Sequence, residues 1–285
     1  MTNLYIGAHI SLDKSIIKTM DNIRSAGGNS LQIFASNPRS TNLVDITKYN
    51  KNANDIKKYL KDNDFKLVIH LPYVINIANE FKVNKRAMPI EDCYWIKLIL
   101  HELNISNLIG SVGVVLHVGK HVKLSYSDGL NNMKKTIEYI ANNMIDNKIN
   151  TKLIIETPSG QGTELLTDLN DFMEFYNSFN KEQQKYIGIC LDTAHTWALG
   201  YELYEAYNIL FKKNAKNITL IHLNNSLVNK GDKKDRHATI LNGVISNNKM
   251  NEFISLLKKE KPMIILETPS SSYKEELSHI YKLLT

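Results

Sequence analysis

The sequence predicts an α/β fold, a single (β/α)8 or TIM barrel over residues 1–285, on three observations. Short apolar runs alternate with longer amphipathic segments, as in βα units around a parallel sheet. There are eight segments of each kind, which is the number that closes a barrel. A doubly wound sheet is the competing architecture, but no glycine-rich phosphate-binding fingerprint follows the first predicted strand.

The eight predicted strands are short runs in which aliphatic side chains dominate, a pattern typical of buried strands. They are Leu4–His9, Ser30–Phe34, Lys66–His70, Gly113–His117, Lys152–Glu156, Tyr186–Asp192, Ile218–His222 and Met263–Glu267.

The eight predicted helices are longer segments with an amphipathic pattern. They are Lys14–Ser25, Asp45–Lys61, Ile90–Leu103, Ser127–Asn142, Leu169–Phe179, Leu203–Phe211, Lys249–Lys259 and Lys274–Leu284. The longest irregular stretch runs from Asn224 to Asn248 and is polar and rich in lysine. A loop of this length in a compact domain is more often functional than idle.

The composition, 43% hydrophobic and 22% charged, supplies ample material for a core. No signal-peptide pattern follows Met1, and no apolar run approaches the ~20 residues of a membrane helix. Cys93 and Cys190 lack a framework spacing, which favours a reducing intracellular compartment, the cytoplasm or wherever the host DNA lies, with a viral source compatible. The net charge of +6 weakly favours nucleic acid, although an A+T-rich genome also produces such a lysine-rich chain.

Metal-capable side chains close most of the predicted strands. Seven of the eight end in this way, at His9, His70, His117, Glu156, Asp192, His222 and Glu267, and His195 follows Asp192 by about one turn. The carboxyl ends of barrel strands meet at one face, where active sites form. Each of these residues alone is more often a packed or capping side chain. Together they indicate a metal site, because buried charges are costly unless paired or metal-bound.

The loop after the seventh predicted strand adds Asp235 and His237, which point to the same side of an extended segment and can reach one ion. With them, nine candidate ligands lie between positions 70 and 267. They are five histidines (His70, His117, His195, His222 and His237) and four carboxylates (Glu156, Asp192, Asp235 and Glu267). This set, which has no thiolate, suits zinc or manganese better than calcium. It would serve two or three ions, with a carboxylate bridging a pair, as is usual for phosphodiester hydrolysis.

At these residues the sequence resembles the endonuclease IV family of abasic-site endonucleases. The resemblance extends from Tyr5-Ile6-Gly7-Ala8-His9 to Leu266-Glu267-Thr268 and so covers nearly the whole chain. Its most specific segments are Leu191-Asp192-Thr193-Ala194-His195, Ile221-His222-Leu223-Asn224, Asp235-Arg236-His237, and Ile155-Glu156-Thr157 followed by Gly160-Gln161-Gly162.

The resemblance implies three zinc ions, with manganese possible at one of them, held by residues carried over motif by motif. The first ion takes His70, His117 and Glu156. The second takes Glu156, Asp192, His222 and Glu267, so Glu156 bridges two ions and is the catalytic residue. The third takes His195, Asp235 and His237.

The activity that the resemblance implies is DNA repair by base excision. The enzyme would hydrolyse the phosphodiester on the 5′ side of an abasic site, leaving a 3′-hydroxyl and a 5′-deoxyribose phosphate, with no covalent protein intermediate. The partner is double-stranded DNA containing abasic sites, no membrane is involved, and the chain is expected to be a monomer.

Four DNA-binding residues are expected from the same comparison. Arg39, in Ser36-Asn37-Pro38-Arg39, would enter the minor groove at the lesion, and Tyr73 would wedge into the base stack. Arg236 and the lysines of its loop would contact phosphates, and Lys120, which departs from the family pattern, would add a new phosphate contact. Abasic DNA bends and unstacks at low cost, which makes extrusion of the sugar selective. Taken singly, Arg39 is more often a solvated charge and Tyr73 a packed aromatic, whereas the basic loop is as often merely solvated.

Three segments depart from the pattern of the family. Val118-Gly119-Lys120 replaces Pro-Gly-Ser after His117, Asn225 replaces an aspartate, and Leu241-Asn242-Gly243 replaces Gly-Glu-Gly. None of these departures removes a candidate ligand, but they change the support around the ligands and the shape of the loops.

Two other interpretations stay open. A metal-dependent sugar isomerase or epimerase on a related barrel also uses strand-end Glu, Asp and His, but with one or two metals. The ligand set for a third metal, His195, Asp235 and His237, therefore separates this class of enzyme from the nuclease. A non-catalytic DNA-binding barrel that keeps its metals for stability is the other alternative.

Overall fold

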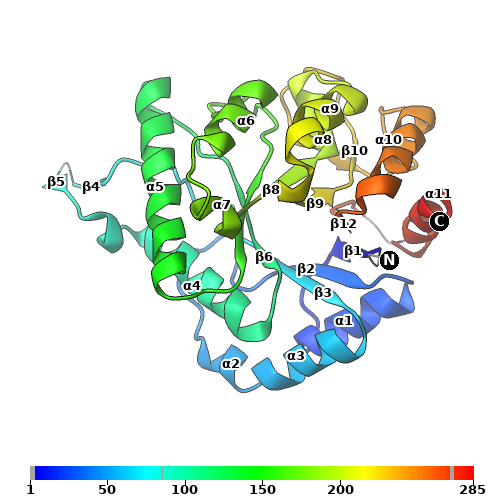
Figure 1. Cartoon of the computed structure of the whole chain (residues 1–285), viewed down its shortest axis with the longest axis horizontal. Coiled ribbons are helices and arrows are strands. Elements are labelled where there is room, and N and C mark those ends of the chain that lie inside the picture. The colour runs from blue at the N-terminus through cyan, green and yellow to red at the C-terminus, as the bar shows by residue number, and fades with distance from the viewer. Residues whose placement is uncertain (1–3, 85, 270–272) are drawn as a thin grey trace.

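The computed structural model describes residues 4–84, 86–269 and 273–285, in which parallel strands close into a barrel ringed by helices (Figure 1). The barrel strands pair in the order β1-β12-β9-β8-β7-β6-β3-β2, and the last closes on the first. Their bounds are β1 (Ile6–His9), β2 (Ser30–Phe34), β3 (Lys66–His70), β6 (Gly113–His117), β7 (Lys152–Glu156), β8 (Ile187–Asp192), β9 (Ile218–His222) and β12 (Met263–Leu266). The predicted (β/α)8 barrel is confirmed.

The principal helices follow the barrel strands. They are α1 (Ile16–Ser25), α3 (Ala53–Asp62), α4 (Tyr94–Ile109), α5 (Tyr126–Asp146), α6 (Leu169–Asn177), α9 (Leu203–Asn214), α10 (Asn247–Glu260) and α11 (Tyr273–Leu284). Several begin at a side-chain cap that the sequence supplies, because a serine or aspartate oxygen accepts an otherwise unpaired amide of the first turn. Ser15, Ser125, Asp168 and Ser246 act in this way.

Some predicted bounds were wrong. The single helix expected over Asp45–Lys61 is divided into α2 (Thr47–Asn50) and α3, and the break falls at Lys51 and Asn52. Asparagine disfavours helix interiors because its side chain competes for backbone hydrogen bonds, and the Asn52 amide donates to the Lys48 carbonyl. The helix expected from Ile90 begins as a 3-10 turn, Ile90–Asp92, before α4.

Two short helices and two small hairpins were not predicted. The helix α7 (Gln183–Tyr186) takes the first residue of the strand expected over Tyr186–Asp192, and α8 (Thr193–Leu199) follows β8 directly. Two small hairpins are β4–β5 (Lys82–Val83 with Arg86–Ala87), which projects away from the ring of helices in Figure 1, and β10–β11 (Asn225–Ser226 with His237–Ala238). The second hairpin lies within the predicted Asn224–Asn248 loop.

Two apolar layers make up the core. The larger lies between the strands and the helices, and the smaller fills the barrel interior with side chains from strands, at Val68, Val115, Ile154, Cys190, Leu220, Met263 and Ile265. At β1 the interior has no room for a side chain, since a Cβ on Gly7 would lie 1.6 Å from the Ser30 carbonyl oxygen. No helix of the described residues is long and apolar enough to cross a membrane.

Candidate metal centre

A polar layer caps the apolar interior of the barrel at the carboxyl ends of the strands. Successive side chains on a strand alternate between its two faces, so a residue two positions after an interior residue returns to the same side. His70 follows Val68 in this way, and Glu156 follows Ile154. The same relation places His117, Asp192, His222 and Glu267 above Val115, Cys190, Leu220 and Ile265. The strand pattern therefore gathers these six side chains at one level.

Glu156 lies at the centre of the layer and is 1% exposed. Its Oε2 lies 3.5 Å from Nε2 of His70 and 3.3 Å from Nε2 of His117. These three residues, which we call the first group, place one ligand atom each within 4.8 Å of one another. The carboxylate is thus shared between two rings from neighbouring strands.

The other oxygen of Glu156 belongs to a second group, which also contains Asp192, His222 and Glu267. Nδ1 of His222 lies 2.8 Å from Oε1 of Glu156 and 3.1 Å from Oε2 of Glu267. It lies 3.9 Å from Oδ2 of Asp192. Glu156 therefore joins the first and second groups, as a bridging carboxylate must.

The third group consists of His195, Asp235 and His237. Oδ2 of Asp235 lies 3.3 Å from Nε2 of His195, and its Oδ1 lies 3.0 Å from Nε2 of His237. Asp192 also faces this group, because its Oδ2 lies 3.6 Å from Nε2 of His237. The helix α8 supplies His195: Oδ1 of Asp192 accepts the His195 backbone amide at 2.7 Å and caps the helix. One aspartate therefore caps α8 and faces two groups.

The histidine rings are held so that one nitrogen of each faces the centre. Nδ1 of His70 lies 2.7 Å from the Leu71 carbonyl, and Nδ1 of His195 lies 2.8 Å from the Thr157 carbonyl. A carbonyl partner requires Nδ1 to carry the proton, which leaves the Nε2 lone pair pointing inward.

The polar atoms at the centre suit a metal ion. Oε2 of Glu156 and Nε2 of His195 and of His237 are buried and lack a hydrogen-bond partner. Burying a polar atom without a partner costs free energy. These three atoms point towards the neighbouring candidate ligands of the first and third groups. Imidazole and carboxylate donors converging in this way fit zinc or another divalent transition metal.

The carboxylates shift the pKa values of the histidines. Burial alone lowers the pKa of His222, but Glu267 and Glu156 outweigh it and raise that pKa to about 9. Burial likewise opposes ionisation of His237, yet Asp192 and Asp235 raise its pKa to about 9. Protons on these rings offset the carboxylate charge, and a divalent ion would displace them.

Cys190 lies directly beneath Glu156 and His222, with its sulfur within 4.8 Å of their ligand atoms. Burial first, and the nearby Glu156 and Asp192 carboxylates next, raise the pKa of the Cys190 thiol well above its usual range. The shift favours the protonated thiol over the thiolate.

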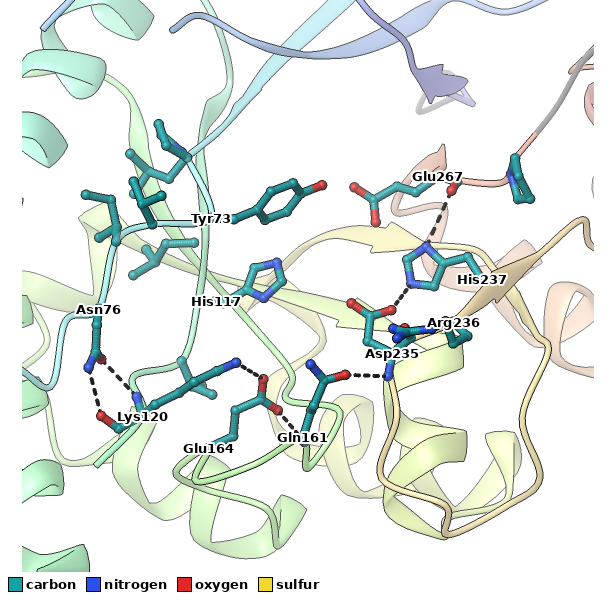
Figure 2. A pocket seen from close by; sticks show the side chains of 17 residues that line it. Tyr73, Asn76, His117, Lys120, Gln161, Glu164, Asp235, Arg236, His237 and Glu267 are labelled. Atoms are coloured by element: carbon teal, nitrogen blue, oxygen red, sulfur yellow. Dashed lines mark hydrogen bonds and ion pairs between the residues drawn. The ribbon is translucent and has the colours of Figure 1, made fainter. Parts of the chain in front are cut away.

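A pocket of about 590 Å³ opens above these groups, and His117, Asp235, His237 and Glu267 line it (Figure 2). Three of the predicted DNA-binding residues, Tyr73, Lys120 and Arg236, also line it. The Tyr73 phenol points across the pocket towards Glu267 (Figure 2).

The fourth predicted DNA-binding residue, Arg39, is exposed and does not line this pocket. Its loop is tied to the pocket wall, because the Tyr73 amide donates to the Pro38 carbonyl at 3.0 Å. Lys120 and Lys230 are both engaged with carboxylates: Nζ of Lys120 lies 3.5 Å from Glu164, and Nζ of Lys230 lies 2.7 Å from Glu202.

Comparison with known proteins adds sequence evidence to this geometry. The family model for xylose isomerase-like TIM barrels matches residues 20–283. A probable endonuclease 4 from Mycoplasma genitalium is 32% identical over 263 residues, which cover 88% of this chain and 86% of that protein. The chain belongs to the endonuclease IV family.

Solved structures show how widely the fold of this endonuclease IV family member is shared. Endonuclease IV from Thermus thermophilus matches it with a TM-score of 0.76 at 19% identity, over 99% of both chains. A 3-keto-D-glucoside 4-epimerase from E. coli matches with a TM-score of 0.66 at 12% identity, over 98% of this chain and 100% of that one. At such identities the likeness shows the fold alone.

Two residues of this endonuclease IV barrel that support candidate ligands were missed in the sequence. Gln32 is fully buried on β2 and contacts both His222 and Glu267. Asn224, also fully buried, donates to Oδ2 of Asp192 at 2.7 Å and accepts the Glu267 amide at 2.8 Å. The available signal was a polar amide within an apolar strand for Gln32, and for Asn224 its position two residues after His222.

Gln161 and Glu164 hold the loops around the third group. Oε2 of Glu164 accepts the backbone amides of Ser159, Gly160 and Gln161 at 2.9–3.1 Å. Oε1 of Gln161 then accepts the Asp235 amide at 3.2 Å (Figure 2). This sequence of contacts connects the loop after β7 to the loop that carries Asp235.

Asn225, one departure from the family pattern, contacts Gly243 in the segment that holds another. The Asn225 side chain donates to the carbonyls of Ile240 and Ile245, and its oxygen accepts the Ile245 amide. It packs against Gly243 so closely that a Cβ there would lie 2.2 Å from Asn225 Cγ. Val118, the third departure, is buried in the core.

Proposed function

We propose that this protein is a zinc-dependent abasic-site endonuclease that hydrolyses the DNA phosphodiester on the 5′ side of the lesion. The observation that supports the proposal best is the gathering of nine candidate ligands into three adjoining groups at one barrel face. The relatives named endonuclease 4 support a nuclease, and the three groups supply the chemistry that such a nuclease needs.

The three groups would each hold one ion. His70, His117 and Glu156 would hold the first ion. Glu156 would also hold the second ion, together with Asp192, His222 and Glu267. His195, Asp235 and His237 would hold the third. Zinc, when bound, activates water for attack on phosphorus and offsets the charge that develops on the departing oxygen.

The surrounding residues fit a duplex with a missing base. Tyr73 is exposed at the rim of the pocket, beside the loop that presents Arg39, and both can meet the distorted step. Lys120 and Arg236 bring positive charge to the same pocket, where a phosphate would lie. An abasic step is easier to extrude than an intact base pair, so a pocket of this kind selects the lesion.

The decisive experiment is incubation of the zinc-loaded protein with a duplex that carries one tetrahydrofuran abasic analogue. We expect a single nick 5′ to the lesion, with no nick in the same duplex lacking the lesion and none after chelation of the metal. Glu156→Gln, which keeps the size of the side chain, should lower the cleavage rate at least about 100-fold while the DNA is still bound. Intact lesion DNA after incubation with the loaded wild-type protein would refute the proposal.

A sugar isomerase or epimerase is the second candidate, because the matching family model is named for xylose isomerase and an epimerase shares the fold. Elemental analysis separates the two, since a nuclease with three groups filled holds close to three metals per chain. Light scattering of the purified protein tests the expectation that it is a monomer. One metal per chain, together with turnover of a ketose, would favour the sugar enzyme.

A further inference from the structure

Gln32 lies on β2, a barrel strand that supplies none of the nine candidate metal ligands. Strand β2 pairs with β1 and β3, and Gln32 lies opposite His9 in the register of β1. The side chain is fully buried at the level of the polar layer. An uncharged amide in this position therefore needs hydrogen-bond partners within the layer itself.

Both ends of the amide find such partners among the candidate ligands. Oε1 of Gln32 lies 2.9 Å from Nε2 of His222. Nε2 of Gln32 donates to Oε1 of Glu267 at 2.7 Å. The same nitrogen lies 3.1 Å from Nδ1 of His9, which in turn lies 3.2 Å from Oε1 of Glu267.

His222 faces the centre with a different nitrogen from the other histidines. His70 and His195 place Nδ1 against backbone carbonyls and present Nε2. His222 presents Nδ1 to Glu156 and Glu267, the side on which an ion would bind. With an ion on Nδ1, the ring carries its proton on Nε2, which needs an acceptor inside the barrel. The acceptor end of Gln32 provides it.

The donor end of Gln32 explains why an amide stands there. A carboxylate would also accept the proton of His222, but it would repel Glu267, whose Oε1 lies against the other end of the side chain. A methionine of similar length would serve neither partner. Among common side chains of this length, only an amide satisfies both contacts at once.

We propose that Gln32 is a positioning residue for the second group: it sets the tautomer of His222 and orients the carboxylate of Glu267. The inference rests on the proposed metal-dependent function, since its consequence is the affinity of the ion that this group holds. Partners of this kind, one step removed from the ion, typically change metal affinity 10–100-fold when they are lost.

The test compares Gln32→Met and Gln32→Glu with Gln183→Met. Gln183 is a buried amide with hydrogen bonds to Asn142 and Asn180, in α7 and outside the polar layer, so it controls for loss of a buried amide as such. Zinc affinity is measured by competition with a chelator. We expect one of three ions to bind about 10–100-fold more weakly to Gln32→Met and no change in Gln183→Met.

Histidine nitrogen NMR of the metal-free proteins separates the two roles of the amide. In Gln32→Met, the Nε2 proton of His222 should lose its hydrogen bond, because its acceptor is gone. In Gln32→Glu, that hydrogen bond should persist while zinc affinity still falls, because the carboxylate accepts from His222 but repels Glu267. Thermal unfolding checks that each variant is folded. If Gln32→Met does not fold, the zinc affinity of Gln32→Glu tests the proposal.

The failure of this inference is distinguishable from failure of the proposed function. Three ions bound by the wild type, and bound equally well by both Gln32 variants, would refute the role of Gln32 alone. A wild type that holds fewer than three ions would refute the proposed function. In that case the NMR comparison on metal-free protein still decides whether Gln32 accepts the Nε2 proton of His222.

Discussion

The backbone amide of Tyr73 donates a 3.0 Å hydrogen bond to the carbonyl oxygen of Pro38, which ties the loop after β3 to the loop after β2. Tyr73 and Arg39, the two side chains expected to meet the lesion, are thereby presented from one joined surface. The Tyr73 ring also packs edge-on against Phe34 and His117, so its orientation is set by rigid neighbours. The surface that carries Tyr73 and Arg39 is therefore held by contacts with the barrel and is not an unconstrained loop.

Replacement of Tyr73 by alanine should weaken binding to abasic duplex about 10-fold, because a stacked aromatic contributes about 1–3 kcal/mol per base. Fluorescence anisotropy with abasic and intact duplexes measures the change. Tyr204→Ala is the matched control, since Tyr204 is 61% exposed and Tyr73 60%, but Tyr204 lies on α9 outside the pocket. Equal losses of affinity in the two variants would mean that the effect comes from removing any exposed tyrosine and not from the position of Tyr73.

Replacement of Asp235 by asparagine should remove one of three bound ions. The carboxylate faces both His195 and His237, and an amide cannot supply the same negative charge to the ion. We expect about two metals per chain after dialysis, measured by elemental analysis. Asp232→Asn is the control in the same loop, where the carboxylate accepts the Asn229 amide at 3.1 Å. Three retained ions in Asp235→Asn would exclude this residue from the ligand set.

The metal-free protein should lose stability as the pH rises from 6.5 to 9.5. His222 and His237 have folded pKa values of about 9, above their ordinary 6.5. A raised folded pKa means that the folded state binds the proton more tightly, so the stabilisation is complete below about pH 6.5 and is lost as the pH passes 9. The unfolding midpoint in chelator should fall by roughly 5 °C over this range.

Two comparisons test that assignment. His222→Gln should reduce the pH dependence and leave the part due to His237, whereas His279→Gln, at a site where the ring pairs with Asn251 on α10, should leave it unchanged. The same protonation predicts that zinc binding releases protons, which calorimetry in buffers of different ionisation enthalpy detects. A metal-free midpoint that rises between pH 6.5 and 9.5 would contradict the sign.

Replacement of Gly243 by alanine should destabilise the fold by about 1–3 kcal/mol through overpacking against Asn225. Chemical unfolding measures the change. In an Asn225→Ala background the same substitution should cost less, because the atoms that its Cβ would meet are gone. Additive costs in the double variant would show that the two positions do not constrain each other.

The sequence by itself determined the barrel and the level at which the candidate ligands lie. Both follow from local rules: alternation along a strand places His70, Glu156 and Glu267 on the interior side, and parallel strands bring their carboxyl ends to one face. The eight strands, and the residues at their ends, were therefore predictable from spacing alone. The departures at Val118, Asn225 and Asn242 were visible too, but not their contacts.

Tertiary structure decided which atoms meet. The sharing of Asp192 between the second and third groups, the use of Nδ1 by His222, and the place of Gln32 between His222 and Glu267 all depend on side chains from strands distant in the sequence. The division of the Asp45–Lys61 helix and the β10–β11 hairpin likewise depend on packing. Periodicity reports the side on which a residue lies. Only the register and curvature of the closed sheet bring particular nitrogen and oxygen atoms within bonding distance.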